Sequence, residues 1–168
     1  QIALKPSSQY KVDGTLLGSV KDGTTVKDLL AQFETADLKV TDASGNATNG
    51  NSVVGTGAKI NLYNGSELVD SLTVVILGDV DGSATIDATD YLRIKSAFLG
   101  GFAMNDAEGT AADVDANAII DATDYIRVKS VFLGGFAINE VEKAAADVDG
   151  NGIIDATDYI RIKSQFLG

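Results

Sequence analysis

Apolar and polar residues alternate with a period of two in the first half of the chain, which predicts short β-strands. Tyr10–Val12 and Leu16–Leu17 flank an Asp13-Gly14 turn signal, and Leu38–Thr41 alternates in the same way. Between them, apolar residues recur at helical spacing over 25–33, with Thr24 as the expected N-cap. This pattern predicts a helix of two to three turns among short strands.

A hairpin is the clearest strand signal in this half. Ala58–Tyr63 and Glu67–Leu77 flank Asn64-Gly65, a pair that can supply the two positive φ angles of a type I′ turn. Residues 1–9 carry the one proline of the chain and are expected to be an arm or linker. The sequence therefore predicts a small, mostly β module with one helix over residues 10–77.

The second half contains one unit three times, at a period of 34 residues, over 79–100, 113–134 and 147–168. About twenty of twenty-four positions are identical between 111–134 and 145–168. Each unit is an acidic loop followed by an expected helix that ends at a glycine. Short connecting helices, each with an asparagine N-cap, are expected over 105–112 and 139–146. The fold class is thus α+β: the mostly β module precedes an array of loop–helix repeats over 78–168.

Two apolar stripes run along each expected helix of the repeats. In the helix of the first repeat, Tyr91, Ile94, Ala97 and Phe98 form one stripe, and Leu92 and Leu99 form a second. The first stripe is sufficient for a core. The second stripe can bury against a neighbouring repeat or contact a partner, and the sequence leaves both interpretations open.

Charge and composition restrict the chemistry. The 168 residues contain no cysteine and no histidine, so metal binding depends on oxygen ligands. The net charge of −11 disfavours nucleic acid and anionic membrane surfaces. Twelve of the twenty-four acidic residues lie in the three loops. No nucleophile paired with a base can be identified, so we do not expect an enzyme.

Each loop places oxygen atoms at positions 1, 3, 5, 7, 9 and 12, with a backbone carbonyl at position 7. Six to eight hard oxygen ligands on a flexible loop are what Ca²⁺ prefers, and two or three ions are expected. A solvated acidic turn is the alternative, which three copies in register make improbable. The expected ligands are Asp79, Asp81, Ser83, Thr85, Asp87 and Asp90 in the first loop, Asp113, Asp115, Asn117, Ile119, Asp121 and Asp124 in the second, and Asp147, Asp149, Asn151, Ile153, Asp155 and Asp158 in the third.

Position 9 is also expected to N-cap the following helix, and position 12 to lie in its first turn. Position 6 bends sharply and prefers glycine, yet Ala84 and Ala118 occupy it in the first two loops, whereas the third has Gly152. A left-handed alanine costs roughly 1–2 kcal/mol. The third loop is therefore expected to bind calcium best.

The run D-V-D-G-S-A-T-I-D-A-T-D-Y-L-R-I-K-S and its two echoes resemble the dockerin family, whose repeats pair an EF-hand-like calcium loop with only its exiting helix, the F-hand. The resemblance covers 78–168. It implies a secreted, non-catalytic module that binds a cohesin on a scaffolding or cell-surface protein. Such modules assemble cellulosomes, the extracellular polysaccharide-degrading complexes of anaerobic bacteria. The preceding β module resembles the X-modules that precede dockerins, of an immunoglobulin-like or β-grasp-like kind.

The resemblance also implies partner contacts at positions 10, 11, 17 and 18 of each repeat. These are Ala88, Thr89, Lys95 and Ser96, then Ala122, Thr123, Lys129 and Ser130, then Ala156, Thr157, Lys163 and Ser164, to which Leu133 is added as a further contact. Serine at position 18 departs from the basic residue common in the family.

A usual dockerin has two repeats. We expect repeats two and three to pair, since they are most alike, although repeats one and two are equally spaced. The chain is expected to be a monomer when unbound. The alternative function is a calcium-stabilised structural or surface segment that has no cohesin partner.

Overall fold

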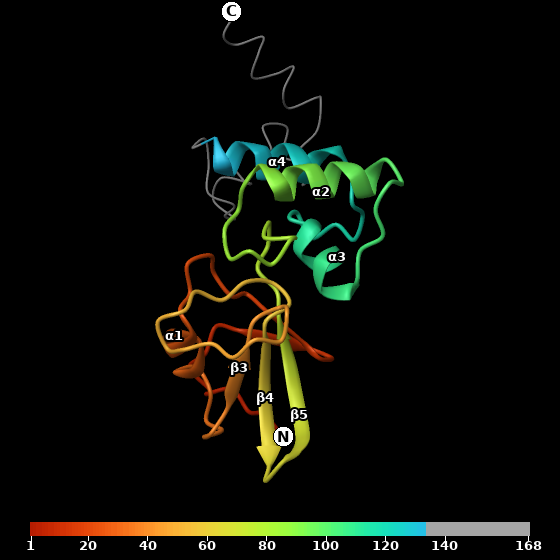
Figure 1. Cartoon of the computed structure of the whole chain (residues 1–168). Helices are drawn as coiled ribbons and strands as arrows, with labels where there is room; N and C mark the ends of the chain where they lie inside the picture. Colours follow the sequence, from red (N-terminus) through yellow and green to blue (C-terminus); the bar gives the residue numbers. More distant parts are fainter. Residues whose placement is uncertain (134–168) are drawn as a thin grey trace, which may run out of the picture.

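The computed structural model describes residues 1–133. These include the β module and the first two repeats. The predictions for the third loop, its helix and the connecting segment 139–146 lie outside the described residues. In Figure 1 the β module occupies the lower half of the molecule and the helices of the repeats occupy the upper half.

One five-stranded mixed sheet forms the β module, in the order β1-β2-β5-β4-β3. The strands are β1 (Lys11–Asp13), β2 (Leu16–Gly18), β3 (Lys39–Thr41), β4 (Lys59–Asn64) and β5 (Glu67–Val74). Neighbouring strands are antiparallel except β2 and β5, which run parallel. A single sheet is not the two-sheet sandwich of the immunoglobulin-like alternative.

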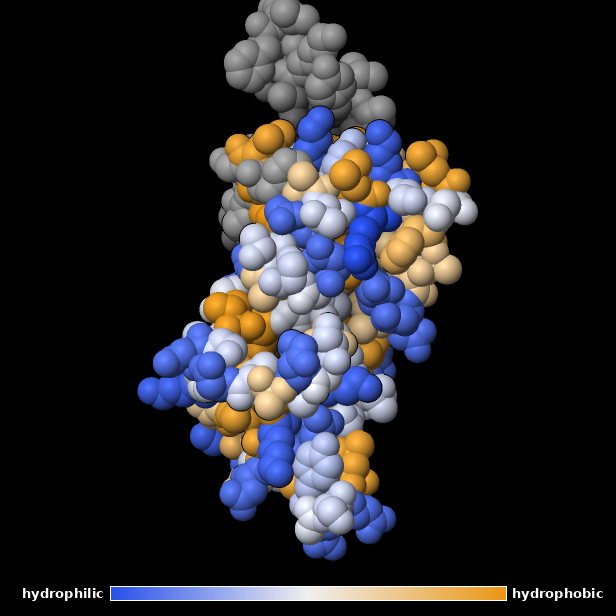
Figure 2. Space-filling view, in the orientation of Figure 1, coloured by the Kyte–Doolittle hydropathy of each residue, from blue (hydrophilic) through white to orange (hydrophobic). Residues whose placement is uncertain are grey.

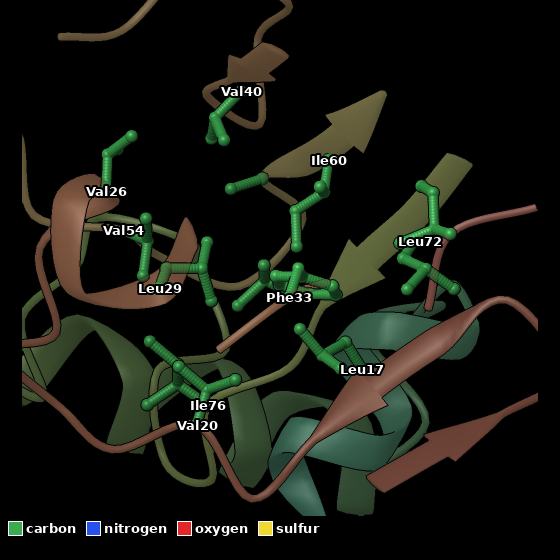
Figure 3. Close-up of a cluster of buried hydrophobic side chains, with 13 residues drawn as sticks. Leu17, Val20, Val26, Leu29, Phe33, Val40, Val54, Ile60, Leu72 and Ile76 are labelled. Atoms are coloured by element: carbon green, nitrogen blue, oxygen red, sulfur yellow. The ribbon is translucent and has the colours of Figure 1, made fainter. Parts of the chain in front are cut away.

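The apolar face of this sheet packs against the short helix α1 (Val26–Leu30). Figure 3 shows the resulting cluster, in which Leu17, Leu29 and Ile60 are fully buried. All five strand segments expected from the alternating pattern are present. The period-two pattern therefore located the strands correctly.

Two local predictions in the module were wrong. Asn64 pairs with Glu67, so the hairpin turn consists of Gly65 and Ser66, and of these Gly65 has a positive φ of 64°. That is the arrangement of a type II′ turn, with glycine first, rather than type I′. The N-cap of α1 is Thr25, which accepts a hydrogen bond from the Asp28 amide at 3.2 Å, because the Thr24 hydroxyl instead donates to the Lys21 carbonyl.

The segment 1–9, expected to be an arm or linker, lies against the module. The Ile2 side chain is buried, and its amide donates to the Asp70 carboxylate at 2.6 Å. Further along, the Lys5 amide donates to the Gln32 carbonyl at 2.9 Å. An apolar residue at position 2 thus anchors the start of the chain to the sheet.

The helical half comprises α2 (Ala88–Phe98), α3 (Asp106–Ala112) and α4 (Ala122–Phe132). The helices α2 and α4 belong to repeats one and two, pack side by side and run in opposite directions, while α3 is the expected connecting helix (Figure 1). Asn105 caps α3 as predicted, and its capping box is completed by Glu108. The chain passes from β5 to the first acidic loop through four residues.

Repeat one packs against repeat two, and the expected pairing of repeats two and three involves residues outside the described part of the chain. Ile94 and Val128, at the same position of the two helices, are fully buried between them. Leu16 and Val75 of the β module also contact this second cluster. Repeat one is therefore part of the helical core. No helix among the described residues has the length and apolar character to span a membrane.

Candidate metal and docking site

Three carboxylates of the first acidic loop converge. Oxygen atoms of Asp79, Asp81 and Asp90 lie within 4.8 Å of one another. Asp79 and Asp90 have no solvent exposure, and Oδ1 of Asp79 has no hydrogen-bond partner among the described residues. A buried carboxylate oxygen without a donor costs free energy unless a cation meets it.

Asp90, at position 12, joins the two ends of this loop. Its Oδ1 accepts the Val80 and Asp81 amides at 2.7 and 3.0 Å, and its Oδ2 accepts the Asp87 amide at 2.9 Å. Asp87 in turn accepts the Thr89 amide at 2.6 Å and is the N-cap of α2, so the two residues form a capping box. The cap at position 9 and the place of position 12 in the first turn are as predicted, and the bonds of Asp90 to the loop start make the loop and the helix start one hydrogen-bonded unit.

The second loop repeats this design. Asp113, Asp115 and Asp124 bring oxygen atoms within 4.8 Å of one another, and Asp124 is fully buried. Asp124 accepts the Val114 amide at 2.9 Å and the Asp121 amide at 2.9 Å, and Asp121 caps α4. The same three positions therefore converge in both described repeats.

In the two described loops the position-9 carboxylates, Asp87 and Asp121, are not among these converging groups. Asp87 and Asp121 point to the helix starts that they cap. The Ser83 hydroxyl donates to the Thr85 carbonyl at 3.1 Å, and Asn117 Oδ1 accepts the Ile119 amide at 2.7 Å. These oxygen atoms are close in sequence to the carboxylates but are engaged by their own loop.

The electrostatics of both loops favour a cation. The pKa of Asp79 is raised to about 6, mainly by burial and also by the nearby charges of Asp90 and Asp81, while the Thr56 amide lowers it. Burial likewise raises the pKa of Asp124 to about 6, with the charges of Asp115 and Asp113 acting in the same direction. Carboxylates that resist ionisation next to one another gain most from a divalent ion. With the donor-free Asp79 Oδ1, this oxygen set fits Ca²⁺.

Backbone strain at position 6 is present as predicted. Ala84 and Ala118 both have a φ of 66°, in the left-handed region. Position 4 is also left-handed, with φ of 72° at Gly82 in the first loop and 58° at Ala116 in the second. Ile86 and Ile120, at position 8 of the two loops, pack against the helical core.

The second apolar stripe of each helix is exposed among the described residues, so repeats one and two do not bury it against each other. Leu92 and Ile126, at one repeat position, are 59% and 54% exposed, and Leu99 and Leu133, at another, are 70% and 67% exposed. Figure 2 shows apolar surface on this helical half of the molecule. The two helices therefore present matching apolar residues to the outside.

The expected partner contacts lie around these residues. Ala88 and Thr89 are exposed, while Ala122 and Thr123 are half-buried. Lys95 and Lys129 both approach the Tyr91 ring, with their Nζ atoms 5.7 and 5.9 Å from its centroid. Ser96 and Ser130 are half-buried, and the Ser130 hydroxyl donates to the Ile126 carbonyl at 3.0 Å.

Sequence reasoning missed a contribution from the β module to the first loop. The Thr56 amide donates to Asp79 Oδ2 at 2.8 Å across the junction of the two halves. The Gly55-Thr56-Gly57 run carries no metal-ligand pattern, so nothing in the sequence pointed to it. The nearest signal is the glycine on each side of Thr56, where backbone can approach closely.

The comparisons with known proteins agree with this geometry. The family model of the dockerin type I domain matches residues 77–133 and 111–167, so each match spans two consecutive repeats. A comparison with curated protein sequences finds no match. Dockerins are non-catalytic domains that bind Ca²⁺ and dock onto cohesins. More than half of the chain is matched, and its two described acidic loops have the geometry of cation sites: the chain belongs to the dockerin type I domain family.

Proposed function

We propose that this chain is a calcium-dependent docking module that binds a cohesin through the outer faces of α2 and α4. The observation that carries the proposal is the matching exposure of Leu92 with Ile126 and of Leu99 with Leu133. Large apolar side chains that are exposed in a repeated arrangement mark a protein interface. The chain is thus expected to present one docking surface per helix.

Calcium would act through the loops that hold these helices. In each loop the position-12 carboxylate fixes the helix start, and the ion would neutralise the carboxylates at positions 1, 3 and 12. The proposed ligands also include the residues at positions 5, 7 and 9, which must turn toward the ion. Two ions would bind in the described residues, and a third would bind at the loop from Asp147 to Asp158.

The proposed setting is extracellular. Dockerins belong to extracellular enzyme complexes, so the partner would be a cohesin on a scaffolding or cell-surface protein in a cellulosome of an anaerobic bacterium. Polysaccharide degradation would then belong to the assembled complex. The net charge of −11 suits a partner with a complementary basic surface.

Calorimetry against a panel of purified cohesins tests the proposal. We expect at least one cohesin to bind in calcium and none to bind after addition of a chelator. The matched variant is Asp90→Asn with Asp124→Asn, which weakens calcium binding in both described loops and should reduce cohesin binding even in calcium. Cohesin binding that persists in chelator would contradict the calcium dependence. Calcium binding without binding to any cohesin in the panel would contradict the docking function and favour a calcium-stabilised structural segment.

A further inference from the structure

The first acidic loop differs from the second in what holds its position-1 carboxylate. In the second loop, Asp113 accepts the amides of Asn117 and Ala118, both from its own loop, at 3.0 and 2.8 Å. In the first loop, Asp79 Oδ2 accepts the Thr56 amide of the β module. Asp79 is fully buried, whereas Asp113 is half-buried.

The Thr56 hydroxyl makes two hydrogen bonds, both to the backbone of Ile76. It accepts the Ile76 amide at 3.0 Å and donates to the Ile76 carbonyl at 3.2 Å. Thr56 is 3% exposed and Ile76 is 1% exposed. The donor that meets Asp79 is therefore held by the segment that leaves β5, and it has little freedom to follow the loop if the loop moves.

Two glycines allow the backbones of the module and the loop to touch. A Cβ atom on Gly55 would overlap the Gly82 carbonyl and lie 2.8 Å from the Ala84 amide nitrogen. A Cβ atom on Gly82 would overlap the Thr56 carbonyl. The second loop has Ala116 at the position equivalent to Gly82, so alanine is accommodated there in a left-handed conformation. Glycine at position 4 of the first loop is thus required by the β module, in addition to the turn.

We propose that Gly55 and Thr56 are positioning residues for the first calcium loop, so that calcium affinity at this loop depends on contact with the β module while the second loop is independent of it. The Thr56 amide holds Asp79 through its Oδ2, which leaves the partner-free Oδ1 for the ion. This inference rests on the calcium binding stated under the proposed function. By thermodynamic linkage, calcium in the first loop must stabilise the contact with Thr56 in return.

The position-4 residues give a matched pair of variants in the full chain, Gly82→Ala and Ala116→Gly. Calcium is titrated while nuclear magnetic resonance follows the amides of Ala84 and Ala118, which report the first and second loops separately. In Gly82→Ala we expect the midpoint at Ala84 to rise at least tenfold and the midpoint at Ala118 to stay within twofold. Ala116→Gly should leave the midpoint at Ala84 within twofold. A Gly82→Ala midpoint at Ala84 within twofold of wild type would overturn the proposal.

Hydrogen exchange on the unaltered chain tests the same coupling without a substitution. Saturation of the first loop with calcium should slow exchange of the Thr56 amide at least tenfold, and unchanged exchange would contradict the coupling. A wild-type chain in which neither Ala84 nor Ala118 responds to calcium would instead refute the proposed function, so the two failures are distinguishable.

Discussion

Tyr91 and Tyr125 meet edge to face, with ring centroids 5.7 Å apart and an interplanar angle of 74°. The two residues occupy the same position of repeats one and two, 34 residues apart. Equivalent residues that contact each other across two antiparallel helices indicate a two-fold relationship between the repeats. Ile94 and Val128 also occupy equivalent positions of the two repeats, and both are fully buried.

The pairing of α2 with α4 predicts that alanine substitutions at two similar-sized residues of α2 will reduce the free energy of unfolding by very different amounts. Ile94→Ala should reduce the free energy of unfolding by about 2–5 kcal/mol, since Ile94 is fully buried between the helices. Leu92→Ala, at a residue that is 59% exposed, should change it by about 0.5 kcal/mol or less. Urea denaturation in saturating calcium measures both values. Equal losses for the two variants would contradict the pairing of α2 with α4.

Asp90→Asn should remove one calcium site. Asparagine keeps the shape of the side chain but replaces one oxygen by a donor, so it cannot both ligate an ion and accept the Val80, Asp81 and Asp87 amides. Calcium calorimetry should show one ion fewer than wild type. The control is Asp13→Asn on the exposed strand β1, which should leave the number of ions unchanged. An unaltered stoichiometry in Asp90→Asn would place the ion elsewhere.

Ala118→Gly should strengthen the second loop. Relief of the left-handed alanine is worth roughly 1–2 kcal/mol, of which the greater chain entropy of glycine offsets about 0.5–1 kcal/mol. We therefore expect a gain of up to about 1 kcal/mol in the free energy of unfolding, measured in chelator so that metal affinity does not contribute. Ala107→Gly, within α3, is the control of opposite sign and should be destabilising. Destabilisation by Ala118→Gly would show that the strain argument fails.

The two-fold relationship also predicts that the face of either repeat can make the main contact with the cohesin. Leu99→Glu or Leu133→Glu alone should change cohesin affinity by about twofold, because the other face remains available. The double variant should lose affinity at least a hundredfold. Calorimetry in calcium measures all three, and circular dichroism checks that the helices are kept. A hundredfold loss from one single variant would assign docking to that face alone.

The sequence predicted those features that depend on neighbouring residues. The position-9 caps, the position-12 carboxylates and the asparagine cap at Asn105 all act within a few residues, so the repeat pattern contains the information. The choice between Thr24 and Thr25 as a cap was not predictable, because it depends on a competing bond from Thr24 to Lys21. The same holds for the hairpin turn, where the register of β4 and β5 decides which residues form the loop.

The long-range relationships could not be predicted from the pattern. Three similar repeats can pair in more than one way, and among the described residues repeats one and two pack together through Ile94 and Val128. The hydrogen bond from Thr56 to Asp79 joins residues 23 apart through a loop without a motif. Such contacts depend on how the module and the loop meet in space.

The direct continuation of β5 toward Asp79 has a mechanical consequence. A pull on a docked partner would reach the sheet through Val75–Gly78 and would act along β5, which lies lengthwise in the molecule (Figure 1). Both neighbours of β5, the parallel β2 and the antiparallel β4, would then be loaded in shear. Interstrand hydrogen bonds loaded this way bear the force together rather than one after another, so the β module would transmit tension as a stiff element.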